Sequence, residues 1–327
     1  MKEKIIRMIH IVSACIPLLL IGLLIAHRIL TGGGITAEEL LTYTPESPIM
    51  AALVMILFFL CKSLSIFFPV TVLCIASGLG AEFVRQLLGR KELDEIWLIA
   101  RRREKMDELC AALADRAGTC RLRVLPMDLT EESALSEYSD LLERERPQVR
   151  WLINAAGFGK MGTNEEIGLE ALDKMVLLNC KAAMDMTQRT MPYLVRGSHV
   201  LEICSTAAFQ PLGGLGVYAA SKSFLLSYSR SLHYEVRGKG IVVTAVCPYW
   251  IKDTEFIPVA RETKDSAAVR HFPFASKCRH VTAWALNDAM LGFSVSTPGP
   301  VCSIHRLVAK FIPRDLMMLG WAGLRRL

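Results

Sequence analysis

Short apolar runs alternate with amphipathic stretches from about residue 70 to residue 248. Six runs rich in valine, isoleucine and leucine predict buried strands: VTVLCIA (70–76), EIWLIA (95–100), CRLRVLPM (120–127), VRWLINAAG (149–157), HVLEICST (199–206) and IVVTAVCP (241–248). Apolar residues at three- and four-residue spacing predict helices over 81–89, 104–118, 131–146, 172–195 and 218–240. This alternation predicts an α/β fold with a doubly wound parallel sheet, and a ligand site at the carboxyl edge of its strands.

The first 68 residues differ, because two long apolar runs dominate them. Residues 9–26 carry no formal charge apart from a histidine, and a helix of that length crosses about 30 Å of hydrocarbon. We favour a transmembrane helix over a secretory signal peptide, since no small-residue cleavage site precedes His27. The second run starts at Pro48, is interrupted by Lys62 and then resumes, so it predicts either a second span or a buried helix followed by a strand.

These runs predict a membrane segment at residues 1–68, with one or two transmembrane helices, ahead of a folded domain at residues 69–327. Three bases precede the first run and three acids follow it: Lys2, Lys4 and Arg7, then Glu38, Glu39 and Glu46. Positive charge before the span favours an N-terminus in the cytoplasm, and two spans return the chain to that side. The prediction is a membrane-anchored protein whose folded domain faces the cytoplasm.

Composition argues against several classes of function. The net charge of +6 is small for 327 residues, and no basic run is interleaved with aromatic residues, so no nucleic-acid partner is indicated. The ten cysteines form no CxxC pair and no cluster with histidine, which argues against a disulfide framework and a metal site. We expect most of these thiols to be reduced and buried.

Tyr218 and Lys222 form the strongest chemical signal. They stand four residues apart within a predicted helix and share one face, and an ammonium beside a phenol lowers the pKa of that phenol from its usual value of about 10. Ser205 lies at the end of a predicted strand, where its hydroxyl can hydrogen-bond a substrate oxygen while the tyrosine gives or takes a proton. A surface pair on an amphipathic helix would be the simpler interpretation if no other motif accompanied it.

Further motifs in the same register resemble the short-chain dehydrogenase/reductase family, from about Leu73 to Pro248. NAAG, from Asn154 to Gly157, looks like the NNAG turn that steadies the family's sheet beside the cofactor. Asn179 matches the helix asparagine that holds a water in the proton relay. The resemblance implies a Rossmann-like fold and hydride transfer between a nicotinamide cofactor and an alcohol or ketone. It implies that Tyr218 is the acid/base, Lys222 its pKa tuner and ribose ligand, Ser205 the oxyanion partner, and Asn179 a relay residue.

The resemblance also implies the cofactor. Asp128 and Leu129 match the pair that contacts the adenine ring. Arg101 and Arg102 follow the second strand, where the family often places bases for a 2′-phosphate, and no acidic residue stands there to bind a free ribose hydroxyl, so NADP is expected rather than NAD. The implied cofactor-binding set is Ser77, Gly78, Leu79, Gly80, Arg101, Arg102, Asp128, Leu129, Asn154, Ala155, Gly157, Tyr218, Lys222 and Pro248.

The phosphate loop departs from the family pattern. TGxxxGxG aligns on residues 73–80 (LCIASGLG), which places Cys74 at the first glycine. That glycine makes the tight turn out of the strand, so a cysteine there is expected to strain the loop or crowd the pyrophosphate. The alternative to an active enzyme is therefore a catalytically weakened binding or scaffolding protein whose cofactor site is disrupted at Cys74.

The substrate side departs as well. Tyr249 follows Pro248 where the family usually has glycine, and with Trp250 it is expected to narrow the nicotinamide end of the pocket, while Thr254 matches a later threonine of the family. Residues 253–280 fall where the family places its variable substrate loop, and their composition suits a small apolar hydroxy or keto substrate or a lid. The tail at 303–327 mixes bases with large apolar residues and predicts a helix either on a membrane surface or packed on the domain.

The N-terminal segment has a resemblance of its own. ITAEELLTYTPESP, a hydrophobic helix, KSLSIFFP and VLCIASGL look like the amino-terminal part of the DedA-like (VTT, SNARE-associated Golgi) membrane proteins. Residues 1–76 would then be a membrane-protein segment that replaces the enzyme's own first strand. A transport or lipid-handling role is disfavoured, because the helices that follow in that family are absent from this sequence. The dehydrogenase resemblance also implies a homo-oligomer.

Overall fold

The computed structural model describes residues 69–70, 78–89, 93–263 and 274–324, which all belong to the unit from Phe67 to Leu327. The transmembrane spans predicted within residues 1–68 lie outside the described residues, as does most of the predicted first strand. Among the helices that are described, none combines the length and the apolar character needed to cross a bilayer.

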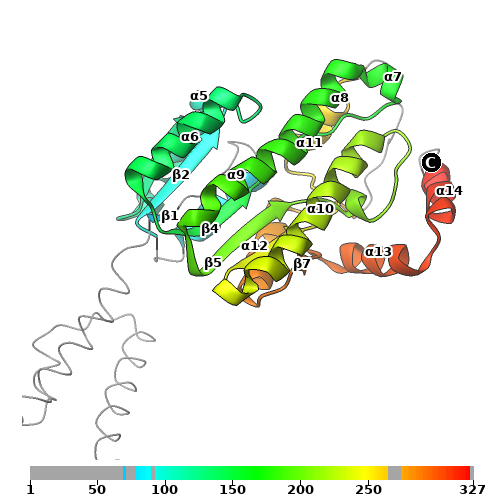
Figure 1. Ribbon diagram of the computed structural model, residues 1–327. Coiled ribbons are helices and arrows are strands. Elements are labelled where there is room, and N and C mark those ends of the chain that lie inside the picture. Colours follow the sequence, from blue (N-terminus) through cyan, green and yellow to red (C-terminus); the bar gives the residue numbers. More distant parts are fainter. Residues whose placement is uncertain (1–68, 71–77, 90–92, 264–273, 325–327) are drawn as a thin grey trace, which may run out of the picture. The chain divides into compact units, whose positions relative to one another are not determined.

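Parallel strands form the centre of the described unit (Figure 1). They are β1 (Pro69–Val70), β2 (Glu95–Ala100), β3 (Arg121–Pro126), β4 (Val149–Asn154), β5 (Leu194–Ile203), β6 (Val242–Val246) and β7 (Val295–Ser296). Hydrogen bonds join them in two ladders, β1-β2-β3 and β4-β5-β6-β7. Because β1 also lies beside β4, the strand order reverses between β1 and β4, as in a doubly wound sheet. The fold class predicted from the pattern is confirmed for this unit.

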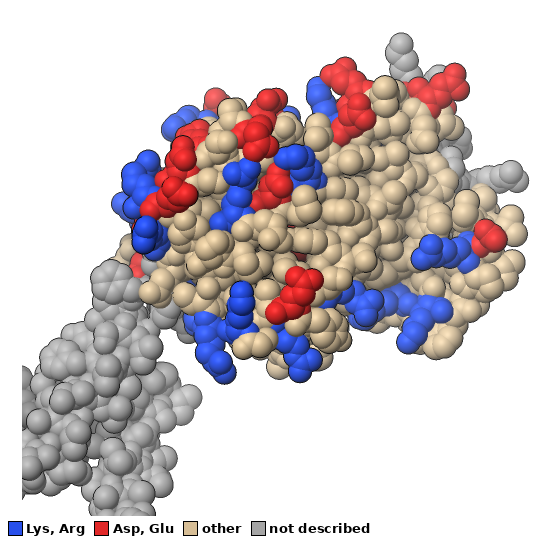
Figure 2. All heavy atoms as spheres, in the orientation of Figure 1, with Lys and Arg blue, Asp and Glu red and all other residues tan. Residues whose placement is uncertain are grey.

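Helices connect the strands. The α-helices are α4 (Leu79–Leu88), α5 (Arg103–Ala117), α6 (Glu132–Glu145), α7 (Asn164–Ile167), α8 (Leu169–Val176), α9 (Ala183–Thr190), α10 (Gly216–Val236), α11 (Phe256–Ala260), α12 (Cys278–Met290), α13 (Pro300–Phe311) and α14 (Arg314–Leu324). A π-helical turn at Leu177–Ala182 joins α8 to α9, and 3-10 turns occur at Met191–Tyr193, Thr206–Phe209 and Arg237–Lys239. Helices α5 and α6 present outer surfaces on which acidic and basic side chains are mixed (Figure 2).

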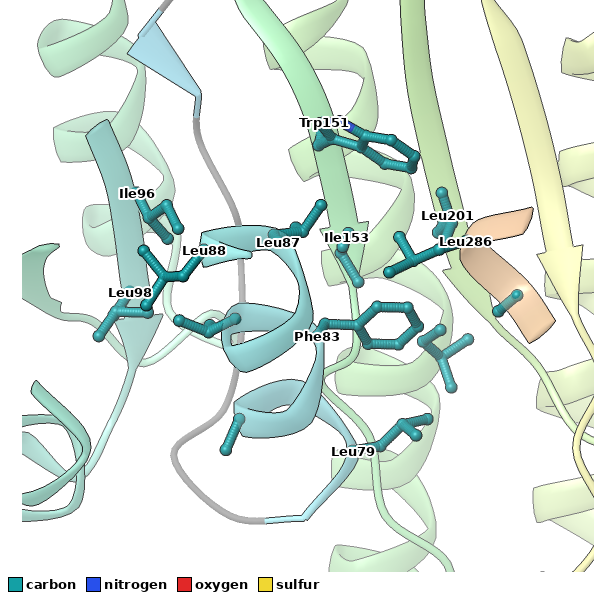
Figure 3. Packing of buried hydrophobic residues seen from close by; sticks show 14 of the residues in the cluster. Leu79, Phe83, Leu87, Leu88, Ile96, Leu98, Trp151, Ile153, Leu201 and Leu286 are labelled. Carbon is teal, nitrogen blue, oxygen red and sulfur yellow. The ribbon is translucent and has the colours of Figure 1, made fainter. Parts of the chain in front are cut away.

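Strand side chains alternate between two cores, one on each face of the sheet. Figure 3 shows the first core, in which Ile96 and Leu98 of β2 and Ile153 of β4 pack against α4. Helices α5 and α12 contribute to the same cluster. The intervening residues of these strands, such as Ile99 and Leu152, point to the second core with α6, α9 and α10. Burial of both faces explains why the strands read as nearly continuous apolar runs.

Three features differ from the predicted pattern. The helix predicted over 172–195 ends at Thr190, and β5 already begins at Leu194, because Pro192 interrupts the helix and Leu194 and Val195 are apolar in either structure. Strand β7 is too short to give a periodic signal, so it was not predicted. The end of the expected substrate loop, from Cys278, is the start of helix α12, which buries one side on the domain.

Candidate active site

The carboxyl ends of the strands lie at one edge of the sheet, and residues that follow them line a cavity of about 950 Å³. Arg101 follows β2, Asp128 follows β3, Gly157 follows β4, Ser205 follows β5 and Pro248 follows β6, and each of these residues lines the cavity. Because parallel strands end at the same edge, residues up to 147 positions apart in sequence reach one pocket. The structure thus brings together most of the residues predicted for the site.

Tyr218 and Lys222 lie one turn apart on α10, and both line the cavity. The Lys222 ammonium is 5.9 Å from the centre of the Tyr218 ring and donates a 2.8 Å hydrogen bond to the carbonyl oxygen of Ile203. Lys222 is 4% exposed, and this burial lowers the pKa of its ammonium, an effect that nearby thiols and Glu202 oppose. The bond to Ile203 ties the lysine to the strand that carries Ser205.

Tyr218 is also buried, and the centre of its ring lies 5.4 Å from the centre of the Phe256 ring. Burial raises the pKa of the Tyr218 phenol above its ordinary value, and a hydrogen bond with Ser205 partly offsets this. The expected lowering of this pKa by Lys222 does not occur in this arrangement, and the phenol carries its proton at neutral pH. A protonated phenol beside a half-buried serine hydroxyl can donate to a substrate oxygen.

Asn179 lies in the π-helical turn between α8 and α9 and is connected to Tyr218 through hydrogen bonds. Its Oδ1 accepts from the backbone N–H of Phe158 (3.0 Å), and its Nδ2 donates to the Phe158 carbonyl (2.9 Å) and to Ser221 Oγ (3.1 Å). Ser221 in turn donates to the carbonyl of Tyr218 (2.8 Å). Asn179 is fully buried and does not line the cavity, so it acts on the site through Phe158 and Ser221. Single π-helical turns often occur at functional sites.

Two glycines after β4 let the backbone pass close to these side chains. A Cβ on Gly157 would stand 2.8 Å from Asn179 Oδ1 and 3.2 Å from Lys222 Nζ. A Cβ on Gly159 would stand 2.9 Å from the Tyr218 ring. Gly157 was predicted from the NAAG motif, whereas Gly159 was missed, because a glycine in a loop gives no sign of which side chain it approaches.

The other end of the cavity carries the residues predicted for the adenosine half of a cofactor. Arg101 lies 3.7 Å from the carboxylate of Asp128, and Arg102 makes a 2.7 Å ion pair with Glu255. Leu129, Leu79, Gly80 and Ala155 line the same cavity. Gly78 has φ +77°, which favours glycine, and Thr254 packs at the position that a Cβ would take there. Cys74 and Ser77 lie outside the described residues.

Asn154 is placed elsewhere. It shares a strand face with Leu152, so its side chain points to α9 rather than into the cavity. Its Nδ2 donates to Glu202 Oε1 (2.8 Å), Thr187 Oγ1 (2.7 Å) and the Ala183 carbonyl (3.2 Å). Glu202 is fully buried, and burial raises the pKa of its carboxyl to about 7, although bonds from Thr187 and Asn154 oppose the rise. Asn154 therefore steadies the sheet behind the cavity.

Aromatic and aliphatic side chains surround the space beyond Tyr218. Tyr249 and Trp250 line it, in edge contact with each other, and their narrowing of a nicotinamide site stays a prediction. The C-terminal helices also line the cavity, a contribution that the sequence pattern does not predict: Val301 and His305 of α13, and Leu316, Met317, Gly320 and Trp321 of α14. Trp321 is held by a 2.9 Å bond from its indole N–H to the Gly213 carbonyl. The substrate end of the cavity is therefore mainly apolar.

Comparisons with known proteins agree on the family. A family model described as short chain dehydrogenase matches residues 69–265. The very-long-chain 3-oxoacyl-CoA reductase of Anas platyrhynchos is 28% identical over 185 residues, 53% of this chain and 56% of the relative. The chain thus spans little more than half the length of that relative. The NADP-dependent 3-hydroxy acid dehydrogenase YdfG of Escherichia coli O6:H1 is 27% identical over 60% of this chain and 77% of its own.

Solved structures share the fold. The short-chain dehydrogenase of Sphingobium yanoikuyae, in complex with NADPH, matches with a TM-score of 0.64 and 27% identity, over 78% of this chain and 95% of that one. The bulky-bulky ketone specific alcohol dehydrogenase of Comamonas testosteroni matches with a TM-score of 0.59 over 77% and 91% of the two chains, at 23% identity. The second likeness speaks for the fold alone.

Proposed function

Because this chain belongs to the short-chain dehydrogenase family, we propose that it transfers hydride between NADP(H) and an apolar ketone or secondary alcohol. As a member of this family it is an NAD(P)-dependent oxidoreductase. One observation carries the proposal: Ser205, Tyr218 and Lys222 converge on one cavity at the carboxyl edge of the sheet. The NADPH bound to the Sphingobium enzyme and the NADP dependence named for the Escherichia coli relative support the choice of cofactor.

The chain's own residues fit a dinucleotide. Gly78 opens α4 with a positive φ, and Leu79 and Gly80 bring the start of this helix to the cavity, where backbone N–H groups suit a pyrophosphate. Arg101 and Arg102 stand where a 2′-phosphate would compete with Asp128 and Glu255 for their guanidinium groups. When bound, the nicotinamide supplies or accepts the hydride.

Proton transfer falls to Tyr218. In reduction, the protonated phenol donates to the carbonyl oxygen of the substrate as its carbon is reduced, and Ser205 hydrogen-bonds the same oxygen. The phenolate that remains is stabilised by the ammonium of Lys222. Asn179 is a positioning residue, which holds Phe158 and the Ser221 link to the backbone of Tyr218. The apolar lining by Trp250, Phe256 and α14 favours a hydrophobic substrate.

Calorimetric titration with NADPH and NADH tests this assignment. We expect NADPH to bind more tightly, and Arg101→Ala together with Arg102→Ala to weaken NADPH binding by roughly tenfold or more while NADH binding changes little, since charge-assisted bonds to a phosphate contribute about 1.5–3 kcal/mol. Absence of NADPH binding in the wild type, restored by Cys74→Gly, would instead support the binding or scaffolding alternative.

The proposal extends to the whole chain. Residues 1–68 form a membrane segment with one or two transmembrane helices, and residues 69–327 form an oxidoreductase domain that faces the cytoplasm; the uncharged run at 9–26 and the charges on either side of it support this. The family match begins at residue 69, so it also includes residues 69–76, which resemble the DedA-like segment. A fusion at this point and a homo-oligomer are part of the proposal.

A further inference from the structure

The C-terminal helices α13 and α14 expose a row of large apolar side chains. Eight of the 18 large hydrophobic residues that are exposed in the described part of the chain fall within residues 304–319. We call them the C-terminal apolar face: Ile304, Leu307, Val308, Phe311, Ile312, Leu316, Met318 and Leu319, each between 38% and 71% exposed. A soluble monomer rarely leaves so many large apolar side chains of two consecutive helices uncovered, so a binding surface is indicated.

The opposite side of each helix is held on the domain. Cys302 of α13 is buried, and His305 is within hydrogen-bond distance of Gln210 (2.9 Å) and meets the Phe209 ring edge-on at 5.8 Å. Trp321 of α14 donates a hydrogen bond to Gly213 and, partly buried, packs against the hydrophobic cluster beside the cavity. The apolar face is therefore presented by anchored helices. Of the two alternatives predicted for the tail, packing on the domain is observed, and the membrane-surface alternative stays a prediction that the exposed apolar side chains motivate.

Basic side chains lie beside the C-terminal apolar face. Arg306, Lys310 and Arg314 are exposed beside it, and within the described residues none of the three has an acidic partner. Asp315 is the single acid between residues 300 and 327. Figure 2 shows mainly basic side chains among uncharged ones over α13, with acidic atoms beside them at the α14 end, whereas acidic and basic side chains are mixed throughout over α5 and α6. On α13, Arg306 and Lys310 share one side of the helix, next to the apolar row.

We propose that the C-terminal apolar face docks on an anionic lipid bilayer, with its apolar residues at the acyl boundary and its bases on the headgroups. Helices with an apolar side flanked by bases bind such interfaces. A second copy of the chain fits less well, because a two-fold contact through this face would set the bases of one protomer against those of the other. The docking does not depend on the reaction.

One consequence does rest on the proposed function. Leu316, Met317, Gly320 and Trp321 line the cavity from α14. Leu316, at the cavity wall, is also exposed to solvent, as are Met318 and Leu319 of the same helix. Docking places this wall of the cavity at the lipid surface. An apolar substrate dissolved in the bilayer then reaches the pocket past α14 without crossing water.

Quenching by lipids with brominated acyl chains tests the docking in the full chain. The reporter is Phe311→Trp, and the matched control is Leu291→Trp, which is 72% exposed just after α12. In vesicles of phosphatidylcholine and phosphatidylserine we expect the added fluorescence to be quenched for Phe311→Trp and not for Leu291→Trp. Lys310→Ala should reduce the docked-to-undocked ratio roughly fivefold, since a base near an anionic surface contributes about 1 kcal/mol.

Equal quenching of the two reporters would overturn the proposal, whether or not residues 1–68 hold the protein in the vesicle. It would also be overturned if scattering in solution showed a dimer that Phe311→Asp dissociates, because a second copy would then cover the face. Neither outcome bears on hydride transfer, which the cofactor titration tests separately.

Discussion

The side chain of Asn179 binds both backbone groups of Phe158, accepting from its N–H at 3.0 Å and donating to its carbonyl at 2.9 Å. This two-point contact fixes the segment between β4 and α7 against the π-helical turn. The remaining amide hydrogen goes to Ser221, so one buried side chain connects the loop beside Gly157 to the helix of Tyr218. Two predictions concern this amide, and two more concern the pH dependence of stability and of the rate.

Asn179→Asp tests the donor half of this contact. A carboxylate keeps the acceptor for the Phe158 N–H but cannot donate to the Phe158 carbonyl or to Ser221. We expect a loss of about 1–3 kcal/mol in the free energy of unfolding, measured in urea, and a fall in kcat with little change in NADPH affinity. Asn164→Ala, at an exposed position of α7, is the control and should leave both quantities unchanged. Full stability and activity in Asn179→Asp would contradict this role.

Gly157→Ala should reduce activity strongly. The added Cβ would stand 2.8 Å from Asn179 Oδ1 and 3.2 Å from Lys222 Nζ, so one of these buried groups must move. In the background of Asn179→Ala, which removes the first clash, the same substitution should cost less. Gly216→Ala at the start of α10 has open space around its Cβ and serves as the control. Equal effects of Gly157→Ala in both backgrounds would show that the contact does not matter.

The buried carboxyl of Glu202 should make the stability of the protein depend on pH. Burial raises the pKa of its carboxyl to about 7 from 4.5, so between these pH values the folded protein holds a proton that the unfolded chain has lost. The proton on Glu202 stabilises the folded protein fully below pH 4.5, and this stabilisation is lost as the pH rises through about 7. The free energy of unfolding should fall across this range by on the order of 3 kcal/mol. We expect urea unfolding between pH 4.5 and 7 to show a smaller dependence of the free energy of unfolding on pH in Glu202→Gln, because the glutamine side chain stays neutral. Glu143→Gln on the exposed side of α6 should not reduce this dependence.

The pKa of Tyr218 should determine how the rate of ketone reduction depends on pH. Burial holds the pKa of its phenol above the ordinary value, so the proton needed for ketone reduction is present throughout the neutral range. The kcat/KM for reduction should stay level up to about pH 10 and fall only above it, while alcohol oxidation should rise with pH. A reduction profile with its midpoint near neutrality would show instead that the bound cofactor and Lys222 lower this pKa in the complex.

Sequence pattern sufficed for β2, β3, β4 and β6, for the pair on α10 and for Ser205, because these depend on spacing within one element or on the common edge of a parallel sheet. It did not suffice where long-range packing decides. The π-helical turn around Asn179 has the same local pattern as an α-helix, and nothing local indicates that Gly159 lies under Tyr218. Asn154 was assigned to the cofactor by motif, although its place on the strand puts it on the face of Leu152, behind the cavity.

Replacement of Tyr218 by phenylalanine tests the central claim most directly, because it removes the proton donor and keeps the ring beside Phe256. The measurement is NADPH oxidation by the purified protein with an apolar ketone that the wild type reduces, together with NADPH affinity. We predict that kcat falls by roughly 10²–10⁴-fold while NADPH affinity is retained. An unchanged kcat in Tyr218→Phe would contradict the assignment of Tyr218 as the acid/base.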